Sequence, residues 1–165
     1  MDEAEALRFL ERHQPLPSDE YLEQHIIDSF DEARSFFAEF PNPASVSLLL
    51  NSFGDGDGLG VYPLVENTVL LQAPEIVMEE LVVALQSHHH SVRYWCAQIA
   101  ANYPHELLVT PLVSLLTEQD YDIKYAALTA LEQISSERSL AAVEQFSKFE
   151  TDPSLVELAK DILDS

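Results

Sequence analysis

The chain has 165 residues, 47% of them hydrophobic, which is enough length and apolar content to bury a core. Its 29 acidic residues outnumber its 8 basic residues, for a formal net charge of −21. Nucleic acids and anionic membranes bind proteins through lysine and arginine, so this balance excludes both as expected partners.

The acidic excess is spread along the chain. Residues 1–66 carry 14 acids and 3 bases, and residues 67–165 carry 15 acids and 5 bases. The charge is therefore a property of the whole surface, and it would attract a basic partner. A host or compartment that favours acidic proteins would explain the same charge without any partner.

Cellular location is indicated by what the sequence lacks. The single cysteine, Cys96, excludes an internal disulfide, and its place on an apolar helix face indicates a core residue. The acidic first residues lack the apolar segment of a secretory signal, and no apolar run approaches the ~20 residues needed to span a bilayer. We therefore expect a cytoplasmic protein without a membrane span.

The first part of the chain has the apolar period of helices. Residues 2–13 form an amphipathic helix that ends at the prolines of residues 14–17. Ser18 is a suitable N-cap for a second helix, which runs to about Phe40 and carries apolar residues at helical spacing. A short helix over 44–53 is followed by residues 54–60, which hold all four glycines, and a helix over 62–72.

The rest of the chain repeats itself. Three helix pairs are predicted, at 75–86 with 91–103, 105–117 with 122–134, and 139–148 with 153–163. Residues 92–96 align with 123–127 and, more faintly, with 155–159, at a period of 31 to 32 residues. Such a period is typical of stacked helical hairpins, which predicts an all-α, right-handed α-solenoid with an N-terminal helical cap.

The second of these pairs carries a family pattern, with Asp120 in the turn, Ile123-Lys124 after it, and Ala127 and Ala130 in the second helix. It resembles a HEAT repeat of the short type found in phycocyanobilin-lyase-like proteins. The first pair departs from the pattern at His89, where an acid is expected, and the last pair at Val156, which replaces the basic residue. The resemblance implies repeats at 74–104, 105–134 and 135–165 and a degenerate unit at 44–73. The apolar helices over 1–43 are expected to cap the open end of this stack.

The second helices of these pairs share a surface pattern. Tyr94 and Gln98 recur one unit later as Tyr125 and Thr129, followed by Glu132. Because second helices line the concave side of such a solenoid, we expect these five residues to contact a partner there. Alternatively, both tyrosines are packed between units, with only their hydroxyl groups at the surface.

The glycine-rich segment admits two functional interpretations. Asp55, Asp57, Gly60 and Glu66 occupy positions 1, 3, 6 and 12 of a calcium-binding loop, but Leu59 replaces the ligand at position 5. We therefore predict no metal site, and keep these carboxylates as a weak calcium candidate. The second interpretation makes Asp55 and Asp57 a further contact patch for a partner, on a loop that is otherwise a long turn.

No nucleophile, phosphate-binding loop or metal cluster is evident, so no catalytic residue and no cofactor are predicted. The sequence predicts a non-catalytic interaction scaffold that docks a protein or peptide, with a basic partner expected. One specific form is an immunity or inhibitor protein that masks a basic toxin or nuclease. The alternatives are a bilin-lyase-like enzyme, which the resemblance implies, and a calcium-responsive binding module.

Overall fold

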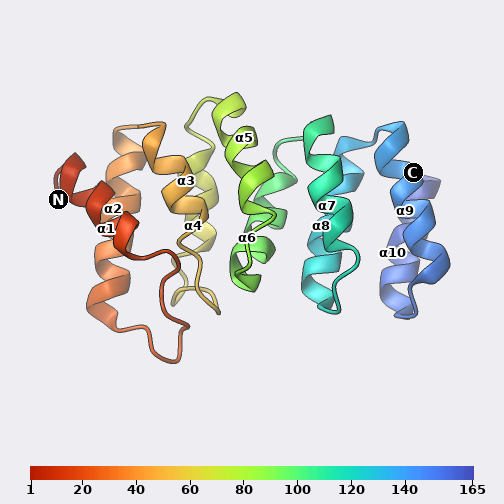
Figure 1. The fold of residues 1–165 in the computed structure, drawn as a ribbon, viewed down its shortest axis with the longest axis horizontal. Helices are drawn as coiled ribbons and strands as arrows, with labels where there is room; N and C mark the ends of the chain where they lie inside the picture. Colours follow the sequence, from red (N-terminus) through yellow and green to blue (C-terminus); the bar gives the residue numbers. More distant parts are fainter. The chain divides into compact units, whose positions relative to one another are not determined.

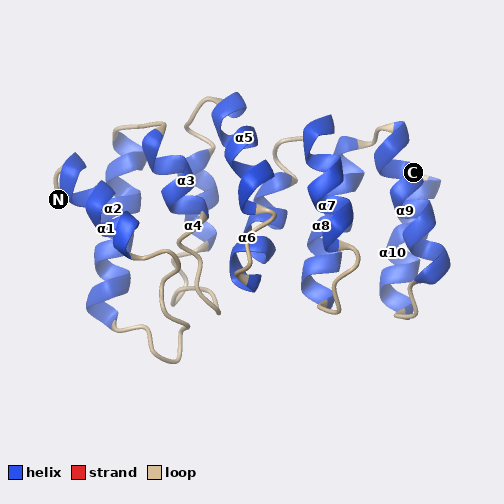
Figure 2. Cartoon of the chain, viewed as in Figure 1, coloured by secondary structure: helices blue, strands red, loops and turns tan.

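The computed structural model describes all 165 residues, Met1 to Ser165, which form ten α-helices, one short 3-10 helix and no strand (Figures 1 and 2). The predicted all-α class is confirmed. The chain divides into two compact units, residues 1–95 and 96–165, with the boundary inside helix α6. None of the helices combines the length and the apolar character required to traverse a bilayer.

The first unit is built on five complete helices and the start of a sixth. They are α1 (Glu3–Arg12), α2 (Gln24–Glu39), α3 (Ala44–Leu50), α4 (Pro63–Val69), α5 (Pro74–Ala84) and α6 (His90–Ala100), which continues beyond the unit. Helix α1 packs against α2 and α3, α2 packs against α4, and α3 packs against α4 and α5. The two N-terminal helices therefore pack onto the helices that follow them.

Aromatic side chains fill much of the core of the first unit. Phe30, Phe37, Phe53 and Tyr62 are at most 1% exposed. The Tyr62 ring meets Phe30 and Phe53 edge to face, with centroids 6.0 and 5.3 Å apart, an arrangement that aromatic pairs favour. Burial raises the pKa of Tyr62 to about 12, so its hydroxyl group stays neutral.

The second helix begins at Gln24 with Glu23 as its N-cap residue, five residues after the predicted N-cap at Ser18. Residues 19–21 form a turn instead, in which the Tyr21 amide donates to the Ser18 carbonyl at 2.8 Å. The Asp19 carboxylate does not cap this helix, because it accepts the backbone amides of Asp57 and Gly58, both at 3.0 Å. The prediction was wrong because the acid has a distant partner that no local pattern reveals.

The second unit contains the remaining hairpins. After the end of α6 it comprises the 3-10 helix η1 (Glu106–Leu108), α7 (Val109–Leu115), α8 (Tyr121–Ile134), α9 (Glu137–Phe149) and α10 (Pro153–Asp164). Helix α7 packs on α8 and α9 on α10, while α7 also meets α9 and α8 meets α10. First helices therefore adjoin first helices and second helices adjoin second helices, as in stacked repeats.

Local sequence signals fix the ends of these helices. The Asp120 side chain caps α8 by accepting the Ile123 amide, and Asp152 caps α10 in the same way. Ser136 and Ser139 form a reciprocal cap at the start of α9. The fully buried Ala127 and Ala159 lie on α8 and α10, where small side chains allow close approach.

Candidate functional site

Two tyrosines lie at the surface of helix α8. Tyr121 is 41% exposed and Tyr125 is 47% exposed, and their rings stack with centroids 6.1 Å apart. The Tyr121 hydroxyl oxygen lies 3.2 Å from Oγ of Ser154 on α10, and the Thr129 hydroxyl group donates to the Tyr125 carbonyl. We call Tyr121, Tyr125 and Thr129 the tyrosine face. Tyr121 was missed, although its spacing of four residues from Tyr125 places both on one side of a helix.

The structure divides the predicted contact residues between its two units. Tyr94 belongs to the first unit, whereas Gln98, Thr129 and Glu132 lie with Tyr125 in the second. Of these five, only Tyr125 is exposed, and the others are partly covered. The alternative, in which both tyrosines pack between units and expose only their hydroxyl groups, therefore does not hold for Tyr125.

Tyr94 packs against a tryptophan that contacts the glycine-rich loop. Its ring meets Trp95 edge to face at 5.3 Å, and the Trp95 indole N–H donates to the Gly56 carbonyl at 3.2 Å. Gly56 separates the exposed Asp55 and Asp57. Trp95 therefore contacts both the Tyr94 ring and the backbone of the loop that carries the two aspartates.

The same loop was the weak candidate for calcium. The Asp57 carboxylate accepts the Gly60 amide at 3.0 Å, and Glu66 lies on helix α4. No group of three or more His, Cys, Asp or Glu side chains in the chain is arranged to hold a metal ion. The backbone amides of Asp57 and Gly58 in this loop donate to the carboxylate of Asp19.

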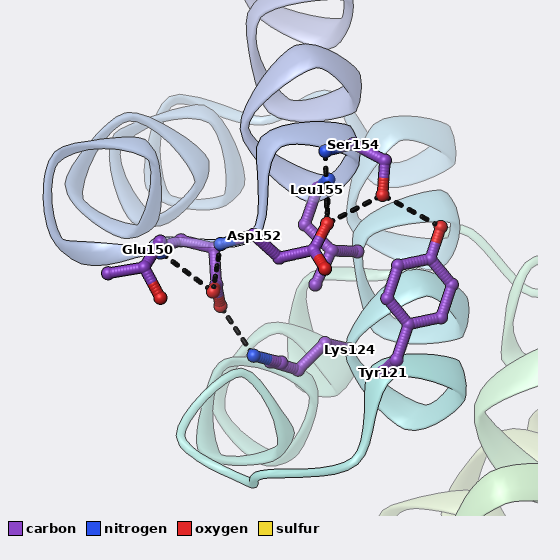
Figure 3. Close-up of polar contacts among 7 residues, drawn as sticks. Tyr121, Lys124, Glu150, Asp152, Ser154 and Leu155 are labelled. Atoms are coloured by element: carbon purple, nitrogen blue, oxygen red, sulfur yellow. Dashed lines mark hydrogen bonds and ion pairs between the residues drawn. The ribbon is translucent and has the colours of Figure 1, made fainter.

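A polar cluster lies where α9 passes into α10 (Figure 3). Lys124 of α8 forms an ion pair with Glu150, and the two side chains are only 11% and 9% exposed. The other Glu150 oxygen accepts the amides of Thr151 and Asp152 at 2.8 and 2.9 Å. The hydrogen bond from Lys124, followed by that from the Asp152 amide, holds the pKa of Glu150 below its ordinary value.

Replacing Lys124 with methionine is expected to lower the free energy of unfolding by about 2 kcal/mol, between the values typical of exposed and buried ion pairs. Because folding lowers the pKa of Glu150, its carboxylate stabilises the folded protein above pH 4.5, the ordinary pKa of glutamate. This stabilisation is lost as the pH falls below that value. Urea denaturation at neutral and acid pH tests this, since Lys124→Met should make stability less sensitive to acid. Lys148→Met, which breaks the exposed pair with Glu144, is the control, and an equal loss there would contradict the assignment.

A groove of about 460 Å³ opens beside this ion pair, between α7 and α9. The apolar residues of its wall are Val113, Leu116, Ala142, Phe146 and Phe149. Phe149 is 75% exposed, the largest exposure of any large hydrophobic side chain in the chain. Sequence reasoning missed this groove, because it placed the contact surface on the second helices and α7 and α9 are first helices.

Cys96 is fully buried, and burial raises the pKa of its thiol. A buried thiol with a raised pKa is a poor nucleophile, because the thiolate is the reactive form. Its observed position agrees with the core role predicted from its helix face.

The comparison with protein families identifies the repeats. A family model described as HEAT repeats matches residues 78–161, just over half of the chain. No curated protein matches the sequence. The match covers the tyrosine face, the Lys124–Glu150 pair and the groove, while the phycocyanobilin-lyase-like subtype stays a prediction. HEAT repeats are commonly protein-interaction scaffolds and are generally non-catalytic, and the all-helical architecture is consistent with an α-solenoid. The chain belongs to the HEAT-repeat family.

Proposed function

We propose that the protein is a non-catalytic scaffold that binds a basic protein or peptide. The tyrosine face, defined by Tyr121, Tyr125 and Thr129, is the main contact. The further contacts are Glu132 and Gln98 in the second unit and Tyr94, Asp55 and Asp57 in the first. A stoichiometric inhibitor that masks a basic toxin or nuclease is the specific form of this function that the charge favours.

The observation that carries the proposal is the exposed stack of Tyr121 and Tyr125 inside the family-matched repeats. Tyrosine is enriched at protein interfaces because it offers a large, rigid contact area with few rotatable bonds. Each ring here is held by the other, and the Tyr121 hydroxyl group also adjoins Ser154. The face is therefore ordered before a partner arrives, which lowers the entropic cost of binding.

Charge supports a basic partner. The second unit contains 12 acidic and 4 basic residues. Three of its four bases, Lys124, Arg138 and Lys148, form ion pairs with acids of the same unit. The remaining acids give the surface a negative field that increases the association rate of a cationic partner.

Tyr125→Ala is expected to weaken binding of the natural partner about tenfold or more, as truncation of an interface tyrosine commonly does. The partner is captured with the tagged protein, identified and purified, and the two proteins are then titrated by calorimetry. Tyr21→Ala is the matched control, because Tyr21 is 71% exposed and lies in the turn before α2. An unchanged affinity for Tyr125→Ala, or an equal loss for Tyr21→Ala, would refute the proposed face.

A further inference from the structure

A pocket of about 530 Å³ opens in the first unit, where α1 packs against α2. Its lining includes Arg8, Phe9 and Arg12 of α1, His13 directly after that helix, and Glu32 of α2. The rings of Phe9 and His13 stack with centroids 4.2 Å apart, and Nδ1 of His13 lies 2.7 Å from the Phe9 carbonyl oxygen. The pocket therefore places two arginines beside an aromatic pair that is held in position.

The two arginines of this pocket have no acidic partner. Neither Arg8 nor Arg12 takes part in an ion pair, although the chain carries 29 acids. Arg34 of the same unit, by contrast, binds the Asp31 carboxylate at 2.7 Å. The spacing of four residues places both exposed guanidinium groups on one side of α1, where like charges repel each other. An anion bound between them would relieve this repulsion and accept hydrogen bonds from both.

The acids of the pocket are already bound to donors of the protein. The Glu5 carboxylate accepts the Asp2 amide at 2.9 Å, and the Glu32 carboxylate accepts the Met1 amino group at 2.6 Å. Three lining cations, the amino group and the two arginines, therefore stand against two acids that have partners. The charges that remain unpaired in the lining are positive, so the pocket favours an anionic ligand.

We infer that this pocket binds a phosphate monoester, with the phosphoryl oxygens at Arg8 and Arg12 and the organic group against Phe9. Two guanidinium groups match a dianion with three terminal oxygens better than a carboxylate, which has one charge and two oxygens. The pocket volume exceeds that of a phosphate ion and is typical of small-molecule sites. The 17 acids and 4 bases of the unit oppose polyanions such as nucleic acids, which favours a ligand with a single phosphoryl group.

Phenyl phosphate is the probe, titrated at neutral pH into the full-length protein while the amide shifts are followed. We expect saturable binding that shifts the amides of Arg8, Phe9 and Arg12 and that weakens about tenfold in Arg8→Met or Arg12→Met. Because both arginines are exposed, these variants should stay folded, which their melting temperatures verify. Lys160→Met is the control and should bind like the wild type, since it removes an exposed cation of the second unit.

Three further probes separate the contributions of the phosphoryl group, the charge and the ring. Benzoate lacks the second negative charge, phenol lacks any charge, and inorganic phosphate lacks the ring, so each should bind at least tenfold more weakly than phenyl phosphate. Equal binding of any of the three would overturn the inference, as would shifts that rise without saturation. An equal loss of affinity in Lys160→Met and Arg8→Met would also overturn it, because the effect would then be one of net charge alone.

A phosphotyrosine peptide distinguishes the two sources of such a group. Tighter binding of the peptide than of phenyl phosphate would assign the pocket to a phosphorylated protein segment, and weaker binding would assign it to a free phosphorylated small molecule. Tyr125→Ala separates the pocket from the proposed function, because Tyr125 belongs to the second unit and does not line the pocket. This variant should bind phenyl phosphate like the wild type, and a loss of affinity equal to that of Arg8→Met would contradict the assignment.

Discussion

Alanine in place of Gly54 is expected to lower the free energy of unfolding of the first unit by about 3 kcal/mol. A Cβ atom at this position would collide with the Leu16 carbonyl oxygen and lie 2.5 Å from that of Pro17. Both are backbone atoms, and the Leu16 amide donates to the Ser52 carbonyl at 2.9 Å, which fixes the segment. Relief of the collision would therefore break buried hydrogen bonds, including that from the Gly54 amide to the Tyr62 hydroxyl oxygen.

Gly60→Ala is the matched control within the same loop. A Cβ atom there would meet nothing within 4 Å, so only the positive φ of +90° opposes the substitution. This strain is about 1–2 kcal/mol for a residue other than glycine. Trp95, the single tryptophan, reports unfolding of the first unit by fluorescence. A Gly54→Ala variant as stable as Gly60→Ala would show that residues 16 and 17 do not approach Gly54 as described.

Truncation of Phe37 to alanine is expected to have the largest effect on stability, about 3–5 kcal/mol. Phe37 is fully buried, so its removal exposes a cavity that the packed helices can close only in part. Because domains are stable by only about 5–15 kcal/mol, this loss should shift the urea midpoint strongly. The measurement is again Trp95 fluorescence in urea.

Phe40→Ala provides the comparison, at the C-terminal end of the same helix. Phe40 caps the end of α2 and is 54% exposed, although its ring lies 5.2 Å from that of Phe36. Its truncation should cost less than about 1 kcal/mol, as is usual for a surface residue. If the two variants lost similar free energy of unfolding, the description of Phe37 as a fully buried core residue would be wrong.

The helices were predictable because their signals are local. Apolar residues at helical spacing, Asp120 and Asp152 as caps, and Pro153 in a first turn all lie within a few residues of the structure they determine. The start of α2 was not predictable in this way. Ser18 and the acids after it resemble a helix cap, but Asp19 instead binds a loop 38 residues away.

The candidate surfaces were predictable only in part. Tyr125 is exposed as the pattern on the second helices suggested, and Asp55 and Asp57 lie at the surface of their loop. The groove was not predictable, because Phe146 and Phe149 have the spacing of a buried helix face. In the structure Phe149 is nevertheless 75% exposed, although α7 and α9 pack together. Trp95 illustrates the same limit, since its bond to Gly56 spans 39 residues.

The dependence of partner affinity on salt concentration tests the proposed recognition of a basic partner most directly. Binding of the purified natural partner is titrated over a series of sodium chloride concentrations, with the wild-type protein and Tyr125→Ala in parallel. We expect affinity to fall steadily as salt screens the acidic surface, and Tyr125→Ala to be weaker at every concentration. An acidic partner, or an affinity that salt does not change, would contradict the account.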